Sequence, residues 1–120
     1  MSIPKIFESE YRFCCILWDN QPVSSSVLVQ LCAEKLGWKK STTYTVIKRL
    51  SERGVLKTEN AVVTALITRD QVQEQESREF VDKTFSGSLP QFLAAFTRHQ
   101  SLSREEIDQI QSLIDNYREV

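Results

Sequence analysis

The residues best suited to chemistry in this 120-residue chain lie in the segment 38–56. If residues 40–53 form a helix, its apolar side chains recur at helical spacing and can be buried along one face: Val46, Ile47 and Leu50. The opposite face carries short hydroxyl side chains near its start and two cations further on: Ser41, Thr42, Thr45, Lys48 and Arg49. Hydroxyl groups reach phosphate oxygens or base edges of DNA. Lys and Arg supply positive charge and hydrogen-bond donors that can recognise guanine. The segment therefore indicates a helix that binds a polyanion, with Lys40 adding charge at its start.

The charge of the chain is distributed unevenly. Residues 1–70 carry ten Lys/Arg and seven Asp/Glu, a net charge of +3, whereas residues 71–120 carry five and nine, a net charge of −4. A basic front half and an acidic back half suggest that one half meets an anion and the other meets protein. Charge alone would favour a solvated amphipathic helix, so the DNA-binding interpretation depends on the elements around the helix.

Other kinds of chemistry find little support in the sequence. Cys14, Cys15 and Cys32 have no C-x-x-C spacing and only His99 as a companion, so we expect buried thiols and no metal site. The chain shows no paired carboxylates, Ser/His/Asp set or glycine-rich phosphate loop, which argues against an enzyme, a cofactor and a small-molecule substrate.

No apolar run approaches the roughly 18 to 20 residues that span a bilayer, and no signal-peptide layout opens the chain. Cytoplasmic residence is the expectation.

The elements around the basic segment are those of a winged helix. The pattern predicts a first helix over 8–18, ended by Asn20 and Pro22, and a second helix that starts at the serines 24–26 and is closed by Gly37. A tight connection then leads to the basic helix, which is the helix-turn-helix arrangement. β-Branched residues on either side of a polar tip at 58–60 predict a two-stranded hairpin. Residues 1–68 are thus expected to form a winged-helix DNA-binding domain.

Residues 69–120 are expected to form a helical dimerisation region. Thr68 caps a helix over 69–85, Pro90 suits the first turn of the next helix, and the capping box at 103–106 opens the last. Apolar stripes follow these helices: Phe80, Phe85, Leu89, Phe92, Leu93, Phe96, Ile107, Ile110 and Ile114. Short helices with apolar stripes need a partner surface, and a second copy of the chain supplies one; the alternative is that they fold back on the winged helix. The expected fold is mainly α with a small β wing.

The chain resembles the penicillinase-repressor and methicillin-resistance-repressor family, which also includes copper-transport repressors. The resemblance rests on W-K-K-S-T-T-Y-T-V-I-K-R-L-S-E-R-G-V-L at 38–56, on Trp18, on F-V-D-K-T-F-S-G-S-L-P-Q-F-L-A-A-F at 80–96 and on the capping-box helix. It implies a bacterial winged-helix repressor that binds a palindromic operator as a dimer. It also implies DNA contacts from the start and middle of the helix at about 40–53: Ser41, Thr42, Thr45 and Arg49, with Lys48 nearby. Copper sensing is rejected because no cysteine follows Cys32.

Three positions depart from the family pattern. Lys39-Lys40 stands where the family usually has Ser-Pro, and the tip at 58–60 lacks the family's Gly-Arg pair, so contact between the wing and DNA is in doubt. Ala95-Phe96 stands where the antibiotic-inducible members have an Asn-Phe bond that a membrane-bound sensor peptidase cuts. Phe96 also belongs to an apolar stripe, so two explanations stay open for it: inactivation by proteolysis, or packing alone.

Two functions of different classes follow. The first is a dimeric repressor that binds a palindromic operator through the helix at about 40–53. The alternative is a winged helix used for protein–protein interaction, whose basic helix docks on an acidic partner without reading a DNA sequence.

Overall fold

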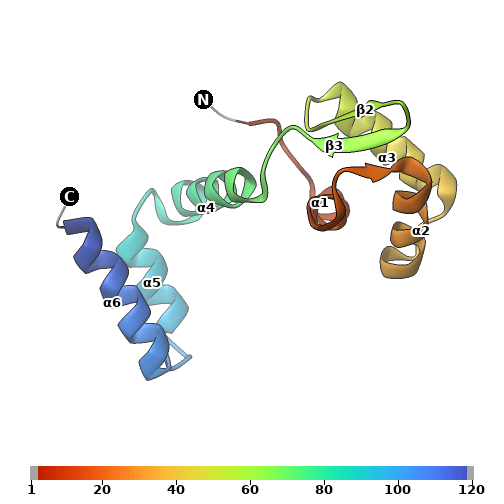
Figure 1. Cartoon of the computed structure of the whole chain (residues 1–120). Helices are drawn as coiled ribbons and strands as arrows, with labels where there is room; N and C mark the ends of the chain where they lie inside the picture. The colour runs from red at the N-terminus through yellow and green to blue at the C-terminus, as the bar shows by residue number, and fades with distance from the viewer. Residues whose placement is uncertain (1–2, 119–120) are drawn as a thin grey trace. The chain divides into compact units, whose positions relative to one another are not determined.

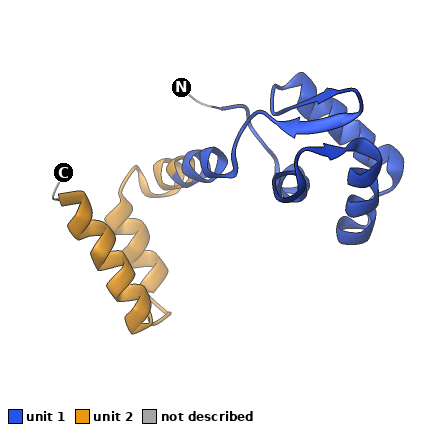
Figure 2. Ribbon diagram, in the orientation of Figure 1, with its two compact units in different colours: residues 1–77 blue, residues 78–120 orange. Residues whose placement is uncertain are grey.

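The computed structural model describes residues 3–118, which form six helices and one three-stranded sheet (Figure 1). In chain order the elements are α1 (Glu8–Asn20), β1 (Val23–Ser24), α2 (Ser25–Leu36), α3 (Lys40–Glu52), β2 (Leu56–Glu59), β3 (Val62–Ala65), α4 (Arg69–Phe85), α5 (Leu89–Thr97) and α6 (Arg104–Arg118). The chain divides into two compact units, residues 1–77 and residues 78–120 (Figure 2). The predicted mainly α fold with a small β wing is confirmed.

The first unit holds the hydrophobic core. α1, α2 and α3 each turn an apolar face inward and β3 closes the layer, so that Phe13, Leu17, Leu28, Leu50 and Val63 are fully buried. Each helix is amphipathic, and burial of such a face, rather than helix propensity, supplies most of the stability of short helices. This packing fixes the orientation of α3 and leaves its other face exposed.

The boundaries of α2 are set by the capping residues that the sequence indicates. The Ser24 hydroxyl accepts a hydrogen bond from the N–H of Val27 at 3.2 Å, which satisfies a free donor of the first turn. Gly37 ends the helix in the left-handed region, with φ of 69°, and its N–H donates to the carbonyl of Ala33 at 3.1 Å. α3 starts three residues later, so the tight helix-turn-helix connection is confirmed.

The sheet has the antiparallel order β1-β3-β2, with Val23 opposite Val63 and Thr58 opposite the same residue from the other side. The expected tip at 58–60 is wrong, because Thr58 and Glu59 continue β2 and the turn is made by Asn60 and Ala61, with φ of 53° and 61°. A two-residue hairpin turn with both φ values positive matches the twist of the strands, and Asn tolerates it well. β1 was not predicted, since two residues are too short to show an alternating pattern.

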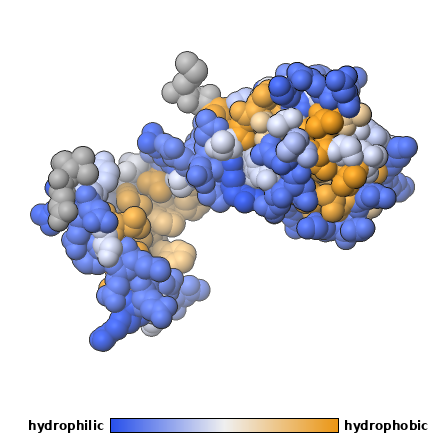
Figure 3. Space-filling model, viewed as in Figure 1, coloured by the Kyte–Doolittle hydropathy of each residue, from blue (hydrophilic) through white to orange (hydrophobic). Residues whose placement is uncertain are grey.

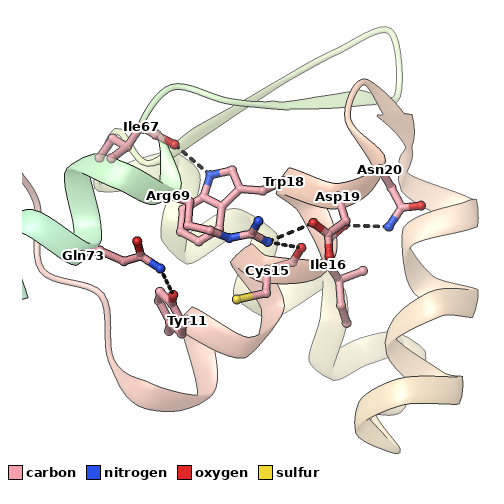
Figure 4. A network of polar contacts seen from close by, with 9 residues as sticks. All are labelled: Tyr11, Cys15, Ile16, Trp18, Asp19, Asn20, Ile67, Arg69 and Gln73. Carbon is pink, nitrogen blue, oxygen red and sulfur yellow. Dashed lines mark hydrogen bonds and ion pairs between the residues drawn. The ribbon is translucent and has the colours of Figure 1, made fainter. Parts of the chain in front are cut away.

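The first turns of α4 belong to the first unit. The indole Nε1 of Trp18 donates to the carbonyl of Ile67 at 2.8 Å, and Arg69 Nη2 donates to Asp19 Oδ1 at 2.9 Å with its guanidinium carbon 5.4 Å from the Trp18 ring centroid (Figure 4). Val72, on the next turn, is 2% exposed. Trp18 is half-buried and anchors the start of α4. The expected division of the chain into a DNA-binding domain over 1–68 and a dimerisation region over 69–120 stays a prediction.

The remaining helices begin where the sequence predicts. Thr68 and Gln71 cap α4 with two reciprocal hydrogen bonds of 2.8 and 3.1 Å, and Ser103 and Glu106 cap α6 in the same way, at 3.1 Å each. α4 ends at Phe85 and is followed by Ser86 and Gly87, both with positive φ. None of the helices in residues 3–118 has the length and apolarity needed to cross a membrane.

Candidate DNA-binding surface

α3 presents all six residues predicted to contact DNA. Its apolar face is buried through Val46, Ile47 and Leu50, together with the hydroxyl-bearing Thr43, which is fully buried. Each of the predicted contact residues is exposed: Lys40, Ser41, Thr42, Thr45, Lys48 and Arg49. The structure therefore brings these side chains together on the solvent face of one helix.

Helix geometry arranges these side chains in three rows, because successive residues are 100° apart around the axis. The row that faces directly away from the core contains Ser41, Thr45, Lys48 and Glu52. One flanking row contains Thr42 and Arg49, and the other contains Lys40 and Tyr44. A helix that enters a DNA groove places its central row, and the residues of its first turn, toward the base edges, and it places its flanking rows further along toward the two phosphate walls.

The hydroxyl groups differ in what they can still bind. Thr45 Oγ1 donates its proton to the carbonyl of Ser41 at 2.9 Å, so its oxygen remains available only as an acceptor. The side chains of Ser41 and Thr42 have no hydrogen-bond partner among residues 3–118, and either hydroxyl can donate or accept. Thr45 therefore suits a donor such as a base amino group, whereas Ser41 and Thr42 suit phosphate or base oxygens.

The start of α3 is held against α1. The ring of Trp38 lies parallel to that of Phe13, with the centroids 6.0 Å apart and an angle of 5° between the planes. Trp38 also donates its backbone N–H to the carbonyl of Cys32 at 3.3 Å. These contacts fix the point from which the exposed hydroxyls project.

The end of α3 is held by a salt bridge that sequence reasoning missed. Arg53, 26% exposed, donates to the carboxylate of Glu10 and, through Nη1, to the carbonyl of Lys5 at 2.7 Å. Glu10 itself is 2% exposed, although it lies on α1. An acidic residue on the same helical stripe as Phe13 and Leu17 was the available signal, because such a residue needs a cationic partner.

Tyr44 is a second residue that sequence reasoning missed. Its side chain is 40% exposed beside the hydroxyl row, and Lys40 Nζ lies 6.0 Å from the centroid of its ring. The i, i+4 spacing of the two residues was the signal that could have found this pair. Their exposure adds an aromatic ring and a cation to one flank of the surface.

The wing carries no excess charge toward DNA. Lys57 Nζ lies 3.5 Å from Glu59 Oε1, and both side chains are exposed, so the only cation of the hairpin is offset. The tip is tied to the start of α2, since the N–H of Ser25 donates to the carbonyl of Ala61 at 2.8 Å. α3 is therefore the main cationic surface of the winged helix.

Cys14 and Cys32 are buried and Cys15 is half-buried. Burial, together with the neighbouring Cys15, raises the pKa of the Cys14 thiol to about 12, and burial raises the pKa of Cys32 despite a hydrogen bond with Thr43. Thiols with raised pKa values stay protonated at neutral pH and are poor nucleophiles and metal ligands. Within residues 3–118 no three His, Cys, Asp or Glu side chains are grouped closely enough to hold a metal ion.

The second unit exposes the side chains predicted to form a dimer. Five of these side chains are exposed, at 46–55%: Phe80, Leu89, Phe96, Ile107 and Ile114. The other four are less exposed and partly buried: Phe85, Phe92, Leu93 and Ile110. Phe92 joins the end of α4 to α5, with its ring centroid 5.9 Å from that of Phe80 and 5.5 Å from that of Phe85. No residue of 78–118 is buried, and Figure 3 shows hydrophobic residues at the surface of this unit. Ala95 and Phe96 lie within α5, near its end.

A helix-turn-helix whose second helix exposes hydroxyls and cations, followed by a hairpin, defines a winged-helix protein of the DNA-binding class. Residues 6–116 match the family model described as penicillinase repressor, and the chain belongs to this family.

Several proteins are similar to the chain along most of its length. The methicillin resistance regulatory protein MecI of Staphylococcus aureus is 22% identical, over 92% of this chain and 94% of its own. The penicillinase repressor of Bacillus licheniformis is also 22% identical, over 97% of this chain and 94% of its own. A 16.5 kDa protein of Latilactobacillus sakei, encoded in the ptsI 3′ region, is 31% identical over 92% of this chain and 78% of its own. The family is one of transcriptional repressors.

Proposed function

We propose that this protein is a dimeric transcriptional repressor that binds a palindromic operator through α3. The observation that carries the proposal is the exposed face of this helix, where hydroxyls lead and cations follow while the other face is buried. Short hydroxyl side chains near the start of a recognition helix reach base edges, and Lys and Arg further along reach phosphates. Relatives named as penicillinase repressors support the same function.

Dimerisation is supported by the apolar surface of the second unit. Leu113 and Tyr117 are 71% and 83% exposed, although both belong to the apolar side of α6. Contiguous apolar surface of this kind is usually covered by a partner. A second copy of the chain provides an identical surface, and the two-fold symmetry of such a dimer matches the symmetry of a palindromic site.

The test is a titration of fluorescein-labelled duplex with the protein, using a palindromic fragment from the promoter of its own gene and a scrambled fragment of equal composition. We expect the palindrome to bind roughly a thousandfold more tightly at physiological salt. The matched variant carries Lys48→Gln and Arg49→Gln, which keep the helix and remove both cations. This variant should lose affinity for both duplexes. Equal affinity of the wild type for palindrome and scramble would contradict the proposal.

The neutral wing favours a second candidate function, in which α3 docks on an acidic protein. A winged helix that binds DNA often adds a cationic wing contact, and here Glu59 offsets Lys57. In this case the wild type would bind the palindrome and the scrambled duplex equally, at the non-specific level. The same titration therefore separates the two candidates.

We also propose that a membrane sensor peptidase inactivates the repressor by cutting the Ala95–Phe96 bond. The bond lies one residue before the last residue of α5, and the N–H of Arg98 donates to the carbonyl of Ala95 at 3.3 Å. Peptidases bind substrates in an extended form, so cleavage requires the last turn of α5 to unwind. The cut would separate α6 from α5 and remove apolar surface from the dimer interface. Mass spectrometry of the protein from induced cells would detect a fragment ending at Ala95.

A further inference from the structure

Glu10 is a buried carboxylate in the first turn of α1, and it joins three segments of the first unit. Its Oε1 accepts a hydrogen bond from the N–H of Phe7 at 2.9 Å, which caps α1. Its Oε2 accepts from Arg53 at the end of α3 and lies 3.9 Å from Arg49 Nη1. Arg53 in turn donates to the carbonyl of Lys5. One carboxylate therefore links the segment before α1, the helix α1 and the last two turns of α3.

The two arginines use Glu10 differently. Arg49 and Arg53 are four residues apart, so their side chains project from the same side of α3. Arg53 is hydrogen-bonded to the carboxylate and mostly buried, whereas the Arg49 side chain is 59% exposed. The carboxylate lies beyond hydrogen-bond distance of the nearest Arg49 nitrogen, so the ion pair uses none of the five guanidinium donors in a hydrogen bond. Arg49 is thus attracted to the Glu10 carboxylate, while its guanidinium can still bind another anion.

We propose that Glu10 is a positioning residue for DNA binding, which holds the exposed guanidinium of Arg49 in place to meet a backbone phosphate. This inference rests on the proposed function. A free arginine loses side-chain entropy when it is immobilised at an interface, and an arginine that is already ordered loses less. The residue acts through Arg49 and makes no contact with DNA itself.

The sign of its effect distinguishes this role from simple electrostatics. A negative charge near a DNA-binding face repels phosphate, so loss of the charge alone should strengthen binding. Loss of a positioning residue should weaken it. Glu10→Gln and Asp19→Asn remove the same charge from the same helix, and the Asp19 side chain is 60% exposed and paired with Arg69 instead of with α3. The second variant is therefore a matched control for net charge.

The experiment measures the operator affinity of the wild type and of both variants at two salt concentrations, after circular dichroism has established that each is folded at the assay temperature. We expect Glu10→Gln to bind about tenfold more weakly, because one arginine in each half-site must then be ordered on binding. Asp19→Asn should bind as tightly as the wild type or more tightly. Operator binding by Glu10→Gln at or above wild-type affinity would overturn the inference. A wild type that binds no operator would instead contradict the proposed function.

Two further measurements exclude a merely structural role. In an Arg49→Ala background, Glu10→Gln should cause no further loss of affinity; an undiminished tenfold loss there would overturn the inference. Relaxation of the Arg Nε–H groups by NMR gives a test that needs no variant. Arg49 should be more rigid in the free wild type than Arg12, an exposed arginine of α1 with no partner among the described residues. Equal mobility of the two side chains would also overturn it.

Discussion

The rings of Phe13 and Trp38 lie parallel, with their centroids 6.0 Å apart. Phe13 is in the middle of α1, and Trp38 lies two residues before the start of α3, so the pair joins these two helices. Phe13 is fully buried and Trp38 half-buried, so the pair is the edge of the hydrophobic core at the point where the recognition helix begins. The placement of the exposed hydroxyls at the start of α3 therefore depends in part on this aromatic contact with α1.

Trp38→Ala is expected to lower the free energy of unfolding by about 2–3 kcal/mol, somewhat less than for a fully buried aromatic residue. Equilibrium unfolding in urea, followed by circular dichroism, measures the change. Tyr44→Ala in the same region is the control, and it should cost less than about 1 kcal/mol because the ring is 40% exposed. Equal losses for the two variants would show that the stacked pair has no special role.

The predicted dimer gives a test on the second unit. Phe96→Ala should weaken association by about 2 kcal/mol if Phe96, which is 53% exposed in the single chain, becomes buried between copies. Sedimentation at micromolar concentrations should give about 28 kDa for the wild type, twice the chain mass of 13.9 kDa, and a monomer–dimer mixture for the variant. Ser112→Ala, on the side of α6 opposite Ile110 and Ile114, should leave association unchanged. A wild type that sediments at the mass of one chain would contradict the dimer.

Much of the fold could be predicted because its signals are local. Ser24, Gly37, Thr68 and the pair Ser103–Glu106 each set a helix boundary through hydrogen bonds within a few residues, and such capping patterns are visible in sequence. β1 could not be predicted, since its two residues become a strand only by pairing with Val62 and Val63. Its existence depends on a long-range contact that no local pattern encodes.

For the candidate site, too, the local features could be predicted from the sequence and the long-range contacts could not. Helical periodicity was enough to separate the buried stripe of α3 from the exposed hydroxyls and cations. The link from Glu10 to Arg49 and Arg53 joins residues about forty positions apart, and it follows from the packing of α1 against the end of α3. The helical pattern identified Lys48 and Arg49 as exposed cations, but it does not show that Arg53 is held by the fold while Arg49 stays exposed.

The ionisation of Glu10 gives a prediction for stability against pH. Burial alone would raise its pKa, but the hydrogen bonds from Arg53 and from the N–H of Phe7, with the charges of Arg53 and Arg49, lower the pKa below its usual value. A carboxylate with a lowered pKa in the folded state stabilises the fold above its unfolded pKa, and the stabilisation is lost as the pH falls through the folded pKa. Glu10→Gln should therefore cost stability at pH 7 and cost less near pH 3, as measured by urea unfolding at both values. A cost independent of pH would show that the charge of Glu10 does not stabilise the fold.

Arg49 should act on DNA mainly through charge. Arg49→Ala is expected to weaken binding to the operator and to scrambled DNA by similar factors, because a phosphate contact carries no sequence information. The slope of log affinity against log salt should fall by about one unit for each lost phosphate contact, thus by about two in a dimer. Titrations at three salt concentrations measure the slope. Arg12→Ala, on the exposed face of α1, is the control and should change the slope less.

Thr42 should act on sequence preference. It lies in the first turn of α3, in the same row as Arg49, and its hydroxyl has no partner in the described part of the chain. Near the start of a recognition helix a short hydroxyl side chain can approach a base edge closely, and loss of such a contact costs about 1 kcal/mol or more. Because the change acts once in each half-site, a dimer should lose about tenfold or more in its preference for the operator over scrambled DNA.

Thr42→Ser and Thr42→Ala separate the hydroxyl from the methyl group of this side chain. If the hydroxyl reads a base, Ser should keep most of the preference and Ala should lose it, while both retain non-specific affinity and the wild-type salt slope. If the methyl group packs on a thymine methyl instead, Ala should keep the preference, since its own methyl can supply part of that contact, and Ser should lose it. Competition titrations of the labelled operator with unlabelled scrambled duplex measure the preference directly. If neither substitution changes the preference, Thr42 does not read the bases.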